Sequence, residues 1–169
     1  MVDEFRRRLE AVDGQVHEAE SLAAARARAR ELIGASTVAR WEDPELEEIV
    51  EDGGRAPAEA AEVSLILADV GVAEIGAIGF VHGSGRPRAS GLLPSRQVAL
   101  LRREGLVASV AEALAYVGLR GSAEGRPPGN VVFAAGPSRT SDIEQRSIRG
   151  VHAPRELEVI LYGPSSTSR

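Results

Sequence analysis

The polar residues with the clearest capacity for chemistry lie in one run that follows an apolar segment. The segment VVFAA (131–135) is followed directly by GPSRTSDIE (136–144). Ser141 and Glu144 have the spacing of a capping box, which predicts a helix that begins there. Ser138 and Arg139 are not needed for such a cap. A hydroxyl and a guanidinium beside the free N–H groups of a helix N-terminus suit a carboxylate or a phosphate.

The remaining side chains of this run leave its role open. Thr140 can serve as the helix cap, whereas Asp142 repels an anion and can pair with Arg139. An anion site and a purely structural cap are therefore both consistent with the run. We take Ser138, Arg139, Thr140 and Asp142 as candidate ligand-binding residues.

His152 is a candidate catalytic residue. It lies in GVHAP (150–154), between the predicted helix and the next apolar segment. An imidazole in such a loop can act as a general base, or it can bind backbone carbonyl groups. The histidines at 17, 82 and 152 do not have the spacing of metal ligands, so the sequence predicts no metal site.

Glu74 is the second candidate catalytic residue. It follows an apolar strand and precedes Gly76, which permits a tight connection. A carboxylate placed there could act as a nucleophile or a base if burial raised its pKa. The alternative is an ordinary hairpin glutamate that pairs with Arg86 or Arg88. We take both arginines, which lie in the polar loop 83–91, as candidate ligand-binding residues.

Composition excludes several classes of function. The chain has 169 residues, which suits one domain with a real core. It contains no cysteine and no lysine, which excludes protein-held iron–sulfur clusters, a P-loop lysine and a Schiff-base lysine. The net charge of −5 argues against nucleic-acid binding. No apolar run is long enough to span a membrane. We expect a cytoplasmic protein with no cofactor of its own.

The elements that must position these residues follow from the apolar periodicity. It predicts helices over 3–13, 17–33, 45–51 and 107–116, another after Ser141, and strands over 36–41, 69–73, 77–81, 98–101, 131–135 and 157–162. Short apolar strands that alternate with helices predict a three-layer α/β/α fold with a mainly parallel sheet. Ligands bind such sheets at the carboxyl ends of the strands, which places 102–105 and 136–140 at the predicted site.

The same pattern divides the chain into three parts. We expect residues 1–60 to form an N-terminal helical segment packed on the domain, 61–162 to form an α/β core, and 163–169 to form a flexible tail. The hairpin within 63–81 could supply an edge strand for a homodimer.

GPSRTSDIE (136–144), followed by GVHAPRELEVILY (150–162), resembles the lactate-utilisation (LUD) family of LutC-like proteins. Members carry GPSRTADIE and then GVHGP, and upstream an acidic-Thr-Gly hairpin, an arginine-rich loop and a Leu-Pro segment. The resemblance covers about residues 60 to 162. Three positions depart from the family pattern, because Ile75, Gln97 and Ala153 replace a usual threonine, histidine and glycine.

The resemblance implies a fold similar to the NagB/RpiA/CoA-transferase proteins. It also implies a role in oxidising L-lactate to pyruvate beside a separate iron–sulfur partner. Ser138 and Arg139 themselves lead us to expect a small anionic metabolite bound at the sheet edge. Two other functions fit the residues: an acyl- or CoA-transferase-like enzyme that uses Glu74, and a regulatory domain that binds an anionic metabolite. Together these hypotheses predict that Ser138, Arg139 and His152 face Glu74 and the loop 83–91.

Overall fold

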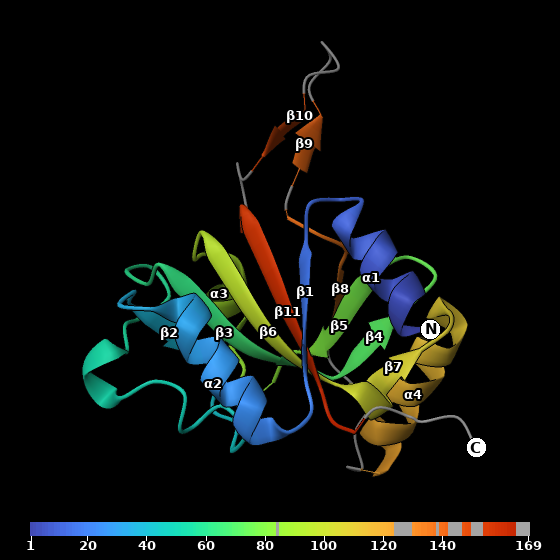
Figure 1. The fold of residues 1–169 in the computed structure, drawn as a ribbon, viewed down its shortest axis with the longest axis horizontal. Coiled ribbons are helices and arrows are strands. Elements are labelled where there is room, and N and C mark those ends of the chain that lie inside the picture. Colours follow the sequence, from blue (N-terminus) through green and yellow to red (C-terminus); the bar gives the residue numbers. More distant parts are fainter. Residues whose placement is uncertain (84, 124–129, 138, 142–146, 150–153, 165–169) are drawn as a thin grey trace.

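A five-stranded parallel sheet forms the centre of the computed structural model (Figure 1). The structure describes residues 1–83, 85–123, 130–137, 139–141, 147–149 and 154–164. The strand order of the main sheet is β1-β11-β6-β3-β2. The bounds are Gln15–Ala19 (β1), Glu156–Tyr162 (β11), Arg96–Arg102 (β6), Val63–Ala68 (β3) and Val38–Arg40 (β2). Every residue of β3 is buried, as expected for a strand covered on both faces.

A second, four-stranded sheet has the order β7-β4-β5-β8. Its strands span Leu106–Val107 (β7), Val70–Val72 (β4), Ala77–Val81 (β5) and Val131–Ala134 (β8). The pairings of β4 with β5 and of β5 with β8 are antiparallel. The predicted strand over 131–135 is therefore real, but it belongs to this sheet and not to the main one. For this reason the loops after β6 and β8 do not share the carboxyl edge of one parallel sheet.

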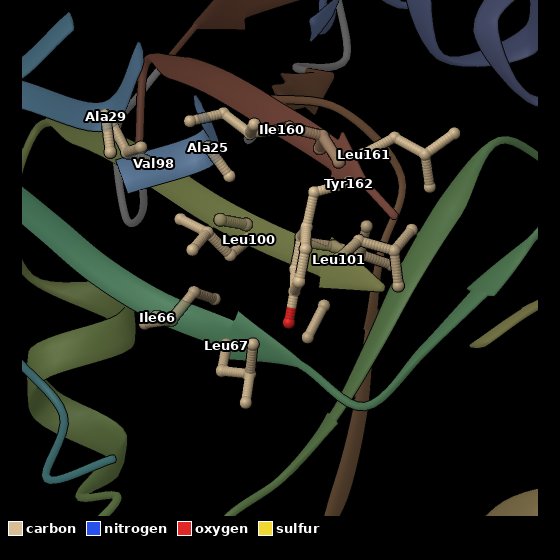
Figure 2. Close-up of a cluster of buried hydrophobic side chains, with 14 of the residues drawn as sticks. Ala25, Ala29, Ile66, Leu67, Val98, Leu100, Leu101, Ile160, Leu161 and Tyr162 are labelled. Atoms are coloured by element: carbon tan, nitrogen blue, oxygen red, sulfur yellow. The ribbon is translucent and has the colours of Figure 1, made fainter. Parts of the chain in front are cut away.

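Helices cover both faces of the main sheet. Their bounds, with those of the two 3-10 turns, are Val2–Glu10 (α1), Leu22–Ile33 (α2), Asp52–Gly54 (η1), Arg88–Leu92 (α3), Arg103–Gly105 (η2) and Val110–Ala123 (α4). Figure 2 shows Ala25 and Ala29 of α2 above Val98 of β6. Gln97 points the other way and donates to the Gly91 carbonyl of α3. Because neighbouring strand residues face opposite sides, α2 and α3 lie on opposite faces, which confirms the α/β class.

The helices in the described part of the chain include none that is both long and apolar enough to cross a bilayer.

The N-terminal segment contributes strands as well as helices. The helix predicted over 17–33 begins only at Leu22, because residues 15–19 form β1, which pairs with β11. The alanine- and arginine-rich sequence that follows favours a helix, so the sequence pattern did not reveal this short strand. Strand β2 confirms the strand predicted over 36–41. The first 60 residues are thus not all helical, and two of their strands complete the main sheet.

The helix predicted over 45–51 is wrong. Residues 44–49 form turns in which Leu46 N donates to Asp43 O and Ile49 N donates to Leu46 O, each a span of three residues. Seven acidic residues lie between positions 42 and 52 with no base among them, so a regular helix would stack like charges. Burial of Leu46 and Ile49 holds the turns in place instead.

The helix predicted after Ser141 is contradicted by a β-hairpin. Strands β9 (Arg139–Ser141) and β10 (Ser147–Arg149) pair antiparallel, with Thr140 opposite Ile148. Figure 1 shows this hairpin projecting beyond the end of β11 where that strand begins. The hydroxyl and β-branched residues of both strands have low helix propensity and favour extended backbone, which outweighs the capping-box spacing.

Gly76 lets the β4–β5 turn approach α1 closely. Its φ is +60°, and a Cβ atom at this position would lie 2.4 Å from the backbone N of Leu9 and 2.6 Å from Cβ of Arg8. Only glycine fits such a contact at this backbone conformation without movement. The predicted tight connection at Gly76 is confirmed.

Candidate functional site

The carboxyl ends of the main-sheet strands bring together charged and aromatic residues from distant parts of the chain. Trp41 follows β2, Asp69 follows β3, Arg102 ends β6 and Tyr162 ends β11. All of these strands are parallel, so their ends lie on one edge of the sheet. Open α/β sheets bind ligands at this edge.

Glu45, Arg102 and Tyr162 form one hydrogen-bonded cluster at this edge. The Tyr162 hydroxyl donates to Glu45 Oε2, and Arg102 donates to Glu45 Oε1 through Nε, at 2.9 Å, and through Nη2. Figure 2 shows the Tyr162 side chain extending from the end of β11 with its hydroxyl oxygen at the far end. Burial raises the pKa of Tyr162, and the Glu45 carboxylate raises it further. The tyrosine therefore stays protonated and acts as a hydrogen-bond donor.

Arg103 is anchored beside this cluster. Its Nε donates to the Gly163 carbonyl at 3.3 Å, and its Nη2 donates to Glu18 Oε2 at 2.8 Å. Glu18 also pairs with Arg6 of α1. The hydrogen bond from Arg103 is the main cause that lowers the pKa of Glu18, so this carboxylate stays ionised.

A pocket of about 640 Å³ opens next to Arg102 and Arg103. This volume falls within the usual range of small-molecule sites. Residues from the start of α1, from the end of β6 and η2, from β7 and from the end of β11 line it: Met1, Val2, Arg102, Arg103, Glu104, Leu106, Tyr162, Gly163 and Pro164. The pocket thus combines an apolar wall with two guanidinium groups.

Arg86, one of the predicted ligand-binding residues, is held by two carboxylates. Its Nη1 donates to Asp69 Oδ1 and Oδ2 at 3.0 and 3.1 Å, and its Nη2 donates to Asp43 Oδ2 at 2.7 Å. The guanidinium also lies 5.5 Å from the centre of the Trp41 ring. Burial alone would lower the pKa of Arg86, but the two aspartates raise it above its usual value. These contacts fix the loop that follows β5 to the ends of β2 and β3.

His82 lies in the same region and was not predicted as a site residue. Its ring makes edge-to-face contacts with Trp41 and Phe80, at 5.5 and 5.3 Å between ring centres. Nδ1 lies 3.3 Å from the Arg86 carbonyl, which places the proton of the neutral ring on Nδ1. Nε2 is buried and has no partner among the described residues. Burial lowers the pKa of this imidazole.

Glu74 occupies the β4–β5 turn, where it is exposed. Its Oε1 accepts a hydrogen bond of 2.7 Å from Val110 N, the first residue of α4. The carboxylate therefore satisfies an otherwise free N–H group at the start of this helix. Glu74 precedes β5, whereas Arg86 follows it. A five-residue strand spans roughly 16 Å, so the structure does not bring these two residues together.

The other predicted site residues are spread over the chain. Arg88 is exposed at the first position of α3. The backbone of Arg139 and Thr140 lies in β9. Ser138, Asp142 and His152 lie outside the described residues, and so does Ala153.

The structure describes two of the three residues that depart from the family pattern. Gln97 is buried, and its Nε2 donates to the Gly91 carbonyl at 2.7 Å. Ile75 is 42% exposed in the β4–β5 turn. Gln97 therefore acts as a link between β6 and α3, whereas Ile75 contributes little to the core.

Sequence reasoning missed Glu45, Arg102, Arg103 and Tyr162. The loop 102–105 was expected at the ligand edge, but its arginines were not singled out. Glu45 was assigned to a helix, and Tyr162 was taken as the end of an apolar strand. Their one common signal is that each lies at or just after the carboxyl end of a predicted strand. In the described part of the chain, histidine and acidic side chains form no group of three or more that could hold a metal ion.

Comparisons with known proteins place this fold in a family. Residues 33–162 match the model described as LUD domain. A relative named lactate utilization protein C, from Halalkalibacterium halodurans, is 32% identical over 114 residues, which cover 68% of this chain and 47% of the relative. A protein of the same name from Deinococcus radiodurans is 34% identical over 109 residues, which cover 64% and 50%. The chain spans about half the length of the curated relatives it matches.

A solved structure has the same fold. The crystal structure of a DUF162 family protein from Deinococcus radiodurans aligns with a TM-score of 0.69 and covers 96% of each chain. The sequence identity is 21%, so this likeness concerns the fold alone.

Proposed function

Because the chain belongs to the LUD domain family, we propose that it is a LutC-like component of an L-lactate utilisation system. The observation that carries this proposal is the 30–34% identity to several relatives named lactate utilization protein C. The aligned segments cover 64–70% of this chain. The proposal takes lactate from the names of these relatives, because the fold itself occurs with many functions.

In the proposed role, the chain supports the oxidation of L-lactate to pyruvate and does not itself carry the electrons. This oxidation releases two electrons and two protons, which need an acceptor. The sequence has no cysteine, so an iron–sulfur cluster held by thiolates must belong to another chain. We therefore propose a separate iron–sulfur subunit as the partner and electron acceptor, and a small anionic metabolite as the ligand.

A genetic test addresses the role directly. Deleting the gene should abolish or slow growth of the host on L-lactate, and growth on glucose should be unchanged. The tagged chain, expressed in the deletion strain, should restore growth on lactate and should co-purify with a cysteine-rich iron–sulfur protein. Normal growth of the deletion strain on lactate, with no such protein recovered, would reject the proposal.

A biochemical test separates support from catalysis. The purified chain alone should not reduce an artificial electron acceptor with L-lactate, whereas adding the recovered partner should produce pyruvate. Lactate oxidation by the purified chain alone would contradict the proposed division of labour.

A further inference from the structure

The two arginines of the carboxyl-edge pocket, Arg102 and Arg103, are held in the same way. In each, Nε and Nη2 donate to oxygen atoms of the protein: Glu45 for Arg102, and Glu18 with the Gly163 carbonyl for Arg103. The Arg102 side chain also interacts with the Tyr162 hydroxyl, and none of the anchoring hydrogen bonds named here uses Nη1 of either arginine. Both side chains line the pocket. The anchors fix the orientation of two guanidinium groups and leave donor capacity on each.

This arrangement suits a ligand with a planar anionic group. A guanidinium binds carboxylates through charge-assisted hydrogen bonds, and holding it in place beforehand reduces the entropy lost on binding. Carboxylates from two elements bind these arginines: Glu45, from the segment after β2, binds Arg102, and Glu18 of β1 binds Arg103. Tyr162 of β11 in turn donates to Glu45. Arg102 is the last residue of β6 and Arg103 begins η2, so both donors are anchored at the edge of the main sheet.

Much of the remaining pocket wall is apolar. Met1, Val2, Leu106 and Pro164 line the pocket together with the arginines. At about 640 Å³ the pocket has room for more than a three-carbon acid. Glu104 is exposed and contributes the only acidic side chain of the lining. A second carboxylate on the ligand would meet this charge, which favours ligands with a single carboxylate.

We propose that this pocket binds a small organic monocarboxylate, whose carboxylate contacts Arg102 and Arg103 and whose carbon chain lies against Met1, Val2, Leu106 and Pro164. This inference deepens the proposed function, on which the choice of lactate and pyruvate as probes rests. It also moves the expected anion site from the residues 138–142 to the ends of β6 and β11.

Binding is tested by calorimetry on the purified chain with pyruvate, L-lactate, hexanoate, succinate and the neutral lactamide. At least one of the three monocarboxylates should bind saturably, and succinate and lactamide should bind at least tenfold more weakly. No saturable binding by any monocarboxylate, or equal binding of lactamide, would overturn the proposal.

The location is tested by amide NMR on the wild-type chain, which does not depend on any variant that could fail to fold. Titration with the tightest monocarboxylate should shift the amide signals of residues 102–106 and 162–163. Shifts confined to 139–149 or to 86–88 would place the ligand elsewhere and refute this site.

A matched pair of variants tests the contribution of Arg103 to ligand binding. Arg103→Gln should weaken binding at least tenfold. Arg6→Gln should leave binding unchanged, because Arg6 also pairs with Glu18 but does not line the pocket. Equal affinities of both variants would contradict the role of Arg103. Binding without any lactate phenotype would reject only the proposed function, whereas a lactate phenotype without binding would reject only this site.

Discussion

Arg86 and Asp69 form a bifurcated hydrogen bond in which Nη1 of the arginine donates to both carboxylate oxygens, at 3.0 and 3.1 Å. Asp69 Oδ2 also accepts from the backbone N of Val81, so one carboxylate joins the end of β3 to the end of β5. The side chain of Asp69 is 7% exposed. Arg86 was expected to bind a ligand, but its guanidinium is already engaged by the protein.

Replacing this cation should therefore destabilise the fold. Arg86→Gln leaves the carboxylates of Asp43 and Asp69 without the charge they share, and removing one partner of a buried ion pair costs about 3–5 kcal/mol. We expect a loss near the low end, about 3 kcal/mol, because Asp43 is partly exposed. Urea unfolding at neutral pH measures it. Arg88→Gln, two residues away and exposed, is the control and should change the free energy of unfolding by less than about 0.5 kcal/mol.

His82 should make stability depend on pH near neutrality. Burial lowers its pKa, and the charge of Arg88 lowers it further, so the folded protein takes up this proton less readily than the unfolded chain. The stabilisation is present above the unfolded pKa of about 6.5 and is lost as the pH falls below that value.

The variant His82→Phe keeps an aromatic ring against Trp41 and Phe80 but cannot titrate. The free energy of unfolding of the wild type should fall more steeply than that of the variant between about pH 7.5 and 5.5. Groups that titrate in both proteins cancel in this comparison. Parallel pH profiles of the two proteins would show that His82 does not cause the dependence.

The contact between α1 and the β4–β5 turn can be tested with two glycines that have the same φ of +60°. Gly76→Ala would place its Cβ against backbone and side-chain atoms of α1, whereas a Cβ at Gly34 meets nothing within 4 Å. Both variants place an alanine at positive φ, and at Gly34, where ψ is −130°, the cost is backbone strain alone. Gly76→Ala should cost about 1–3 kcal/mol more because of overpacking. Equal losses of unfolding free energy would mean that the turn moves away from α1 freely.

Substitutions at Glu74 distinguish a structural role of its carboxylate from a catalytic one. Its Oε1 accepts from Val110 N, and a glutamine retains that acceptor. Glu74→Gln should therefore keep the stability of the wild type, and Glu74→Ala should lose about 1 kcal/mol in urea unfolding. In a CoA-transfer assay, activity in the wild type that Glu74→Gln abolishes would support the transferase hypothesis instead. Absence of activity in both proteins would leave the carboxylate with its capping role.

Apolar patterns in the sequence predicted several strands well but missed the central strand β3. All six of its residues, Val63–Ala68, are buried, yet the strands predicted in this region span 69–73 and 77–81. β6, β8 and β11 lie within one or two residues of the expected runs. For β6 and β11 the reason is that strands covered on both faces read as continuous apolar segments. The same patterns did not reveal which sheet each strand joins. Nothing local to Val131–Ala134 indicates that it pairs antiparallel with β5, since that choice depends on residues some fifty positions earlier.

The errors come from segments where local and tertiary preferences differ. Ser141 and Glu144 have the spacing of a helix cap, yet residues 139–141 pair with 147–149 as strands. Asp43 and Pro44 resemble a helix start, and Asp43 Oδ1 does accept from Glu45 N as a cap would. The chain nevertheless continues as turns, which lets Glu45 reach Tyr162 and Arg102. The candidate site depends on this tertiary contact, so local reasoning could not find it.

The pairing of β1 with β11 has a consequence for how the protein reaches its native state in the cell. Gln15 lies beside Glu158, so an outer strand made early in synthesis finds its neighbour only when the last strand of the sheet has left the ribosome. Until then the nascent polypeptide exposes the apolar face of β1 and the edge of β6 with which β11 later pairs. Contacts this distant in sequence slow folding and prolong the lifetime of aggregation-prone species. Translation speed and chaperone supply should therefore affect the yield of this protein.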